Sequence, residues 1–205
     1  MSSESRTYRK RRRADSEAQT RQRITESAVH LHGTVGPSRT SMSAVAEHAG
    51  VQRSTLYRHF PDEAALFEAC SAHWVAANPR PDLAAWAAIA DPDERLRVGL
   101  RELYAYYERT APMLENLLRD EDRHEVVRAR FQGFHAFVAA MADTLMAGRR
   151  LRGAARRRTR AAIGHAVTFS TWRSLVREQG LSHADAVELA CGFVLSAARC
   201  TPSRH

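Results

Sequence analysis

The chain is organised around the stretch Ser41-Met-Ser-Ala-Val-Ala-Glu-His-Ala-Gly-Val-Gln-Arg-Ser-Thr-Leu-Tyr-Arg-His-Phe60, which predicts two short helices joined by a tight turn. Ser41 suits the N-cap of the first helix, because its side-chain oxygen can accept a hydrogen bond from a free backbone N–H. Gly50 stands where that helix must end, since glycine adopts a left-handed conformation at little cost. Apolar residues at helical spacing would anchor both helices to a core: Val45, Ala46, Ala49, Leu56 and Phe60.

The second helix leaves a polar face that suits a recognition helix. Gln52 and Arg53 near its N-terminus could reach base edges in a DNA major groove. The Ser, Thr, Tyr and His side chains that follow could hydrogen-bond phosphate oxygens. The alternative interpretation is an ordinary surface helical hairpin whose polar residues face water.

This stretch resembles the DNA-binding motif of the TetR family of transcriptional regulators. The resemblance rests on Met42-Ser-Ala-Val-Ala-Glu-His-Ala-Gly-Val51 followed by Ser54-Thr-Leu-Tyr-Arg-His-Phe60, and it covers about residues 18–70. It implies an all-α fold, in which an N-terminal three-helix helix-turn-helix domain precedes a helical ligand-binding and dimerisation domain. It also implies a homodimer.

The resemblance assigns a role to individual residues of this chain. It places base reading at Gln52, Arg53 and Ser54, and contact with or support of the phosphate backbone at Ser41, Ser43, Thr55, Tyr57 and His59. One position departs from the family pattern: the family usually has a Lys three residues after the Phe60 position, and here Glu63 stands there. The departure puts that phosphate contact in doubt.

Composition and charge agree with a DNA-binding protein. The formal net charge is +8; residues 1–60 hold eleven Arg and Lys against five Asp and Glu, while the remainder holds twenty against eighteen. The positive excess therefore lies on the segment that contains the motif, as a nucleic-acid footprint requires. No apolar run could span a membrane. The three cysteines form neither a disulfide framework nor a metal-ligand pattern, so we expect a cytoplasmic protein.

Three segments are expected along the chain. Residues 1–17 read as a disordered basic tail, residues 18–62 as the helix-turn-helix domain, and residues 63–205 as the helical ligand-binding and dimerisation domain. The run Arg9-Lys-Arg-Arg-Arg13 is either an arm for the DNA backbone or minor groove, or a solvated charge run. The first helix should cover about residues 18–32.

The second half of the chain predicts further helices. Pro112 should interrupt one of them, and the charged run 119–125 should form a solvated turn. Two long helices over 154–179 and 182–198 carry small residues and could pair with their symmetry mates in a homodimer. The alternative is that they only complete the core of the monomer.

A small-molecule pocket is expected among large side chains of this half, namely Tyr104, Tyr107, Met113, Phe131, Phe134 and Trp172. Plain core packing fits the same spacings. No nucleotide-binding loop, zinc-protease or serine-hydrolase motif occurs, and the histidines lack ligand spacing, so no catalytic residue, cofactor or metal is predicted.

The sequence therefore predicts a ligand-responsive transcriptional regulator rather than an enzyme. It would act as a repressor that binds a pseudo-palindromic operator as a homodimer, and a small-molecule effector would alter that binding. Two hypotheses from other classes stay open: an all-helical enzyme, and an architectural protein that binds DNA through its basic tail without sequence preference.

Overall fold

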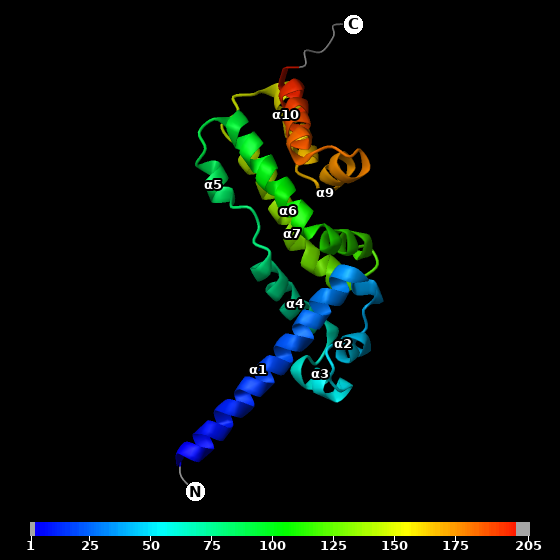
Figure 1. Cartoon of the computed structure of the whole chain (residues 1–205). Coiled ribbons are helices and arrows are strands. Elements are labelled where there is room, and N and C mark those ends of the chain that lie inside the picture. Colours follow the sequence, from blue (N-terminus) through cyan, green and yellow to red (C-terminus); the bar gives the residue numbers. More distant parts are fainter. Residues whose placement is uncertain (1–2, 200–205) are drawn as a thin grey trace. The chain divides into compact units, whose positions relative to one another are not determined.

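The computed structural model of the protein describes residues 3–199 and contains no strand in that range, which confirms the all-α fold class. Its helices are shown in Figure 1. They are α1 (Ser3–Thr34), the 3-10 turn η1 (Pro37–Arg39), α2 (Met42–His48), α3 (Arg53–His59), α4 (Glu63–Ala77), α5 (Leu83–Ala87), α6 (Pro92–Asp120), α7 (Glu125–Met146), α8 (Gly153–Ala166), α9 (Phe169–Trp172), the π-helical segment η2 (Arg173–Glu178) and α10 (His183–Arg199). None of these helices is long and apolar enough to cross a membrane.

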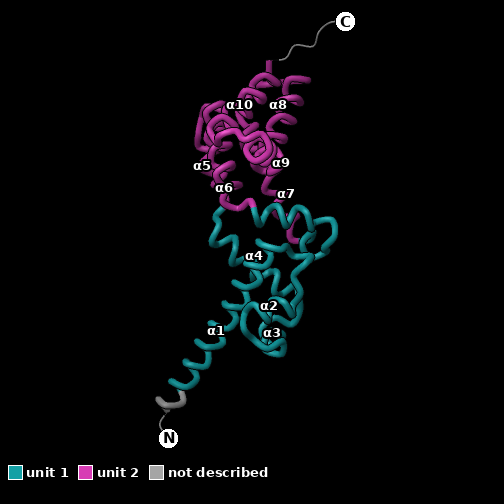
Figure 2. The backbone as a smooth tube through the Cα atoms, turned by 45° about the vertical axis from the view of Figure 1, so that its right-hand side comes forward, with its two compact units in different colours: residues 1–79, 112–129 teal, residues 80–111, 130–205 magenta. Residues whose placement is uncertain are grey.

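The chain divides into two compact units (Figure 2). Unit 1 contains residues 1–79 and 112–129, and unit 2 contains residues 80–111 and 130–205. Unit 1 is therefore larger than the helix-turn-helix segment 18–62 that the sequence suggested. It includes α4, the last turns of α6 and the first turn of α7, and Val127 of α7 is fully buried in its core.

The core of unit 1 is built from the apolar residues that the motif supplies. Val45 and Ala46 of α2 and Leu56 of α3 are at most 2% exposed. Ile24 and Ala28 of α1, together with Leu66 and Phe67 of α4, pack in the same cluster. Burial of these side chains supplies the main favourable free energy that holds the short helices α2 and α3, which could not persist alone.

Helix α1 corrects the expectation of a disordered tail. It begins at Ser3, so most of the segment 1–17 is helical, although Met1 and Ser2 lie outside the described residues. The described side chains from Thr7 to Gln19 are all exposed, and Arg13 pairs with Glu17 one turn later at 3.2 Å. No Gly or Pro precedes residue 33, and a buried helix from Ile24 onward removes the cost of nucleation.

Helix α6 also differs from its prediction, because it continues through Pro112 to Asp120. A proline inside a helix removes one backbone hydrogen bond and crowds the carbonyl four residues earlier. Buried side chains on both sides of it, among them Tyr107 and Leu114, outweigh that cost. The division between the two units falls at this proline, with residues 92–111 of α6 in unit 2 and residues 112–120 in unit 1.

Unit 2 packs α5, most of α6 and α7, and α8 to α10 around buried aromatic and aliphatic side chains. Trp86 is fully buried and its indole N–H donates to Glu102 at 2.7 Å. Arg95 is only 6% exposed and donates to the carbonyl oxygens of Ile89, Thr144 and Ala147. Its guanidinium thus satisfies carbonyls at the ends of helices α5 and α7.

The helix expected over residues 154–179 is broken in two places. α8 ends at Ala166, and α9 begins after Thr168, whose hydroxyl donates to the His165 carbonyl and accepts from the Thr171 amide. A threonine that hydrogen-bonds the backbone in this way competes with a continuous helix. From Arg173 to Glu178 the backbone is π-helical. The expected final helix is present as α10, and Ser182 caps it by accepting from the Asp185 amide.

Candidate DNA-binding site

The turn between α2 and α3 has the geometry that its sequence predicts. The Ser41 hydroxyl oxygen accepts a hydrogen bond from the Ala44 amide at 3.1 Å and caps α2. Gly50 has a φ of 64°, and the following amide of Val51 donates to the Ala46 carbonyl at 2.9 Å. These bonds form a Schellman motif, which needs a left-handed residue at the glycine. The turn therefore fixes the direction in which α3 leaves α2.

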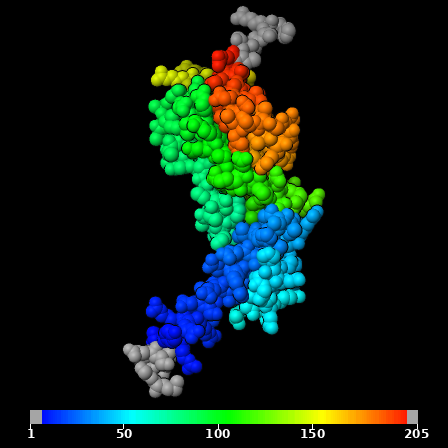
Figure 3. Space-filling model, viewed as in Figure 1, coloured from blue at the N-terminus to red at the C-terminus, as the bar shows by residue number. Residues whose placement is uncertain are grey.

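Helix α3 presents its predicted base-reading residues to solvent. Gln52, Arg53 and Ser54 are exposed, and the Gln52 side chain makes no capping hydrogen bond at the helix N-terminus. Tyr57 is 42% exposed, whereas Leu56 and Phe60 on the opposite side are fully buried. Figure 3 shows this segment, in cyan, open on the surface of unit 1. Side chains without internal partners can bind DNA with little loss of internal bonding.

The other residues that are predicted to contact phosphate differ in exposure. Ser41 is exposed, while Ser43, Thr55 and His59 are half-buried. The Nε2 atom of His59 is covered and has no hydrogen-bond partner among the described residues. Burial lowers the pKa of His59 below its usual value, and the charges of Arg58 and Arg21 lower it further. His59 therefore favours its neutral form at the end of α3.

Arg21 holds the C-terminal end of α3 and was not foreseen from the sequence. Its guanidinium donates to the His59 carbonyl at 2.7 Å and lies 4.1 Å from the centre of the Phe60 ring. A cation at a helix C-terminus can donate to a free carbonyl, and it interacts favourably with the negative end of the helix dipole. The Phe60 ring adds a cation–π contact. Arg21 is 38 residues from His59 in the sequence, so no local pattern could have indicated the contact.

A second unforeseen group of contacts lies where α6 ends in unit 1. Asn116 donates to the carbonyl oxygens of His32 and Gly33, and Arg119 donates to that of Val35. Asp120 accepts from the Ser38 amide at 3.0 Å and from Arg119. Asn116, Arg119 and Asp120, which we call the α6 clasp, thus hold the segment that joins α1 to α2.

The α6 clasp corrects part of the expectation of a solvated turn over residues 119–125: residues 121–123 do form a turn, in which Asp122 and Arg123 are exposed, but Arg119 and Asp120 belong to α6. The side chain of Asp120 is only 4% exposed. Burial by itself would raise the pKa of Asp120, but the hydrogen bonds from Arg119 and from the Ser38 amide hold the pKa below its usual value. Gly36, with a φ of 95°, makes room for the clasp, because a Cβ there would lie 2.0 Å from the Arg119 Nη2 atom.

Two other polar residues, His32 and Glu63, have internal contacts near the α6 clasp. His32 is 7% exposed, and its Nδ1 atom lies 3.5 Å from the Sγ atom of Cys70. Burial lowers the pKa of His32 to about 4; the charge of His124 adds to this effect and that of Asp120 opposes it. Glu63, which stands where the resemblance leads us to expect a lysine, lies 3.2 Å from the His124 Nε2 atom. Glu63 therefore has an internal contact at the start of α4.

Comparisons with known proteins agree with this geometry. Residues 24–70 match the family model described as "Bacterial regulatory proteins, tetR family". The chain carries a TetR-type DNA-binding domain. A comparison with curated proteins finds no match.

Solved structures of TetR-type proteins share the fold of the chain. NalD, the secondary repressor of the MexAB-OprM multidrug efflux pump in Pseudomonas aeruginosa, has 22% identity and a TM-score of 0.58, over 89% of this chain and 97% of its own. A TetR transcription regulator from Haloarcula marismortui has 14% identity and a TM-score of 0.58, over 89% and 97%. A protein from Clostridium perfringens, named as a candidate fatty acid metabolism regulator, has 14% identity and a TM-score of 0.62, over 85% and 97%. The chain therefore has the fold of a TetR-family transcriptional regulator.

The six residues that the sequence predicts to bind a ligand fall into three groups. Tyr104 and Tyr107 donate to the carbonyl oxygens of Ala166 and Val167, and the Trp172 ring lies 6.1 Å from that of Tyr107. The ring centres of Phe131 and Phe134 lie 4.9 Å apart. Met113 belongs to unit 1, beside Gly33. Their part in ligand binding stays a prediction.

The surface of unit 2 has an apolar hollow on the predicted dimerisation helices. Its volume is about 270 Å³, and it is lined by His165, Ala166, Thr171, Leu175, Leu189, Ala190 and Phe193. Leu189 and Phe193 on α10 are 54% and 53% exposed, which is unusual for side chains of this size. A Cβ at Gly164 or Gly192 would meet nothing within 4 Å, so α8 and α10 are open to close approach there.

No cluster that could hold a metal ion occurs among residues 3–199: nowhere in this range do three His, Cys, Asp or Glu side chains gather suitably. His30 and His32, two residues apart, point to different surroundings. The His30 ring stacks on that of His48 at 4.8 Å, whereas His32 is buried beside Phe67. Cys70 and Cys191 are both buried, and Cys200 lies outside the described residues.

Proposed function

We propose that this protein is a ligand-responsive, non-enzymatic transcriptional repressor that binds a pseudo-palindromic operator as a homodimer in the cytoplasm. The observation that carries the proposal is the two-sided character of α3. Its buried residues, Leu56 and Phe60, are fixed in the core of unit 1, while Gln52, Arg53 and Ser54 are free at its N-terminus. A helix held in this way can enter a major groove without rearrangement of its support.

The exposed and half-buried side chains of the helix-turn-helix receive two kinds of role in the proposal. Arg53 and Gln52 read base edges, because their side chains can form bidentate hydrogen bonds with guanine and adenine respectively. Tyr57, Thr55 and Ser41 bind phosphate oxygens and fix the register, which gives affinity without sequence preference. Two such helices in a dimer would lie in successive major grooves, about 34–36 Å apart.

The apolar hollow on α8 to α10 supports the homodimer. A second copy of the same surface would bury Leu189 and Phe193 by two-fold symmetry, as an isologous interface requires. Their removal from water, at about 25 cal/mol per Å² of apolar area, would favour association. The small residues Gly164 and Gly192, where an added Cβ would meet nothing within 4 Å, would let α8 and α10 approach their partners closely.

The surroundings of Trp172 support a response to ligand. The Trp172 side chain is fully buried, yet its indole N–H has no hydrogen-bond partner among the described residues. An unpaired buried donor costs about 1–3 kcal/mol, and a ligand carbonyl or hydroxyl could remove that cost. The π-helical segment that follows, Arg173–Glu178, is a form of backbone that occurs frequently at functional sites.

The α6 clasp offers a route for the response. Helix α6 supplies Tyr104 and Tyr107 to unit 2, and its last turn holds the α1–α2 connection in unit 1. A ligand that favours one conformation of α6 would therefore alter the support of α2 and α3. Allosteric coupling of this kind is typically about 1–3 kcal/mol, or 5- to 150-fold in operator affinity.

The proposal is tested by selection of random and genomic DNA duplexes with the purified full-length protein at about physiological salt. A two-fold symmetric enriched site is expected. The Arg53→Ala variant should then lose base preference at one position of each half-site, whereas Arg23→Ala, which removes an equal charge from exposed α1, should keep it.

Two results would contradict the proposal. If Arg53→Ala leaves the selected site unchanged, α3 does not read bases in the proposed way. If binding occurs without enrichment and is lost when residues 1–17 are deleted, the basic helix α1 dominates, and the protein binds DNA architecturally.

A further inference from the structure

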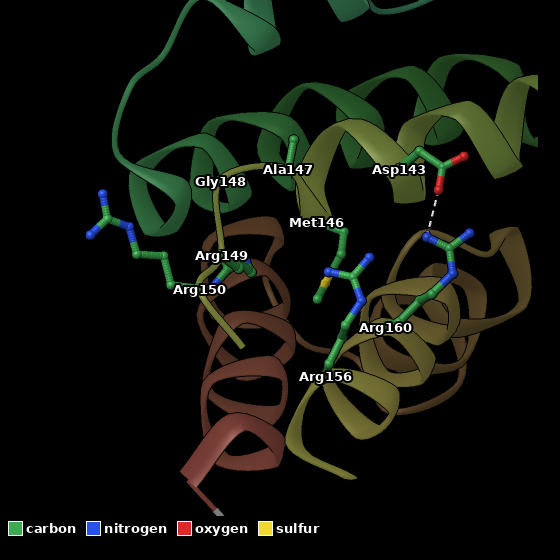
Figure 4. A pocket seen from close by; sticks show the side chains of 8 residues that line it. All are labelled: Asp143, Met146, Ala147, Gly148, Arg149, Arg150, Arg156 and Arg160. Atoms are coloured by element: carbon green, nitrogen blue, oxygen red, sulfur yellow. Dashed lines mark hydrogen bonds and ion pairs between the residues drawn. The ribbon is translucent and has the colours of Figure 1, made fainter. Parts of the chain in front are cut away.

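A second cavity of unit 2 is unusually rich in arginine. It lies where α7 ends and α8 begins, and its volume is about 370 Å³, within the range of small-molecule sites. Its lining residues are Asp143, Met146, Ala147, Gly148, Arg149, Arg150, Arg156 and Arg160 (Figure 4). None of the residues that the sequence assigns to DNA or ligand contacts lies among them, whereas Arg156 and Arg160 lie within the segment 154–179 that it assigns to the dimer.

Two of the four arginines are held in place by internal bonds. Arg149, whose side chain is 6% exposed, donates to Asp93, to the Pro92 carbonyl and to the Leu145 carbonyl. Arg160 pairs with Asp143 at 2.5 Å, an ion pair that Figure 4 shows as a dashed line. These bonds orient the two guanidinium groups without removing all of their positive charge from the cavity.

The other two arginines have no internal partner. Arg150 and Arg156 are exposed and form no hydrogen bond, ion pair or ring contact with the rest of the described chain. Arg156 and Arg160 are four residues apart on α8, and Figure 4 shows both rising from the same side of that helix toward the end of α7. Like charges at this spacing repel one another, and the pairing of Arg160 with Asp143 offsets part of that repulsion.

The start of α8 adds to the positive potential of the cavity. Arg152 is the N-cap residue and gives no side-chain hydrogen bond, and the first turn contains no acidic residue. The N-terminus of a helix carries a partial positive charge that favours anions and opposes cations. Arg156 and Arg157 nevertheless follow directly after this first turn. Both the helix end and the arginines would be stabilised by a bound anion.

We propose that this cavity binds the phosphoryl group of a small phosphorylated metabolite. Arg156 and Arg160 would grip the phosphate oxygens through paired N–H donors, for which the planar guanidinium is suited. Arg149 forms the fixed wall of the site, and Arg150 can close over the ligand from the loop. Asp93 and Asp143 each neutralise one of the four arginines, so two positive charges remain, and they match a group with two negative charges better than a monoanion.

The test is calorimetric titration of the full-length protein with inorganic phosphate and with ADP, at constant ionic strength and without DNA. The variant Arg156→Gln/Arg160→Gln is compared with Arg130→Gln/Arg157→Gln, which removes the same charge from exposed residues that do not line the cavity. We expect one ADP per chain, binding at least tenfold weaker in the first variant, and less than a twofold change in the second. All four substituted side chains are exposed, so both variants should melt close to the parent protein.

The titrations either support or overturn the proposed phosphoryl site. Phosphate and ADP of similar affinity would show that the phosphoryl group alone is recognised, and tighter ADP would show that its second phosphate or its adenosine contributes as well. Equal weakening by the two variants would overturn the proposal in favour of general attraction to a protein of net charge +8. The absence of binding at millimolar ligand would also overturn the proposal. A fall in the operator affinity of the first variant, measured without phosphate, would overturn it as well, because the cavity would then be a DNA contact. The site is independent of operator recognition by α3, so either proposal can fail alone.

Discussion

Replacement of Asp120 by Ala is expected to loosen the connection between α1 and α2 without unfolding the core of unit 1. The Asp120 carboxylate accepts the Ser38 amide at 3.0 Å and the Arg119 guanidinium at 2.9 Å and 3.2 Å. After the substitution the Ser38 amide has no acceptor, and Arg119 retains only Asn116 and the Val35 carbonyl. The segment 35–40 that leads into α2 should therefore open more often.

The size of the effect follows from the two bonds. A hydrogen bond to a charged acceptor contributes about 1.5–3 kcal/mol, and the Ser38 amide loses such a bond. The Arg119 side chain is 43% exposed, so solvent screens its pairing and this second bond adds little. The loss of about 1.5–3 kcal/mol from the Ser38 bond corresponds to roughly a 10- to 150-fold rise in local opening.

Amide hydrogen exchange of the full-length protein measures this opening directly. Peptides that cover residues 35–40 should exchange faster in Asp120→Ala, while peptides of α10 should not change. The control is Asp122→Ala, since Asp122 is exposed and its side chain makes no internal bond. If the two variants exchange alike over residues 35–40, or if Asp120→Ala changes them less than threefold, the α6 clasp does not hold this segment.

Three further results are expected. Arg21→Met should weaken operator binding about five- to tenfold through loss of the His59 contact, and the salt dependence of binding should not change, because no phosphate contact is lost. Phe193→Asp should shift the protein from dimer to monomer in light scattering, whereas Tyr8→Asp, at another exposed aromatic, should not. Because the pKa of His32 is lowered to about 4 in the folded state, the unfolded state takes up its proton first as the pH falls below 6.5; stability should be complete above pH 6.5 and fall by about 2 kcal/mol between pH 7 and pH 5. His32→Gln should flatten that dependence in denaturant titrations.

The parts of the fold that rest on local sequence signals could be predicted. Ser41, Asp62 and Ser182 each cap the helix that the sequence starts there, since a side-chain oxygen acts on amides only two or three residues away. Gly50 and the buried pair Leu56 and Phe60 fixed the helix-turn-helix geometry for the same reason. The signals act over one helical turn, so tertiary structure did not override them.

The predictions that the structure contradicts concern segments whose conformation is stabilised by contacts with distant parts of the chain. Pro112 predicts a break when its own cost is considered, but the burial of Tyr107 and Leu114 on either side keeps α6 continuous. The charged run at the end of α6 read as solvated, because sequence alone does not show that the Ser38 amide lies opposite Asp120. The role of the six expected ligand residues stays a prediction, because large side chains on facing helices are also typical of a packed core.

The arginines of this chain show why net charge is a poor measure of the DNA interface. Arg21 holds the end of α3, and Arg95 satisfies three carbonyl groups while almost fully buried, so neither is available to a phosphate without loss of structure. Arg53 is exposed and has no internal partner. The salt dependence of operator binding counts phosphates that are neutralised, at a slope of about −0.9 for each. It should therefore follow the number of exposed, unpartnered arginines on unit 1 that face the duplex rather than the net charge of +8.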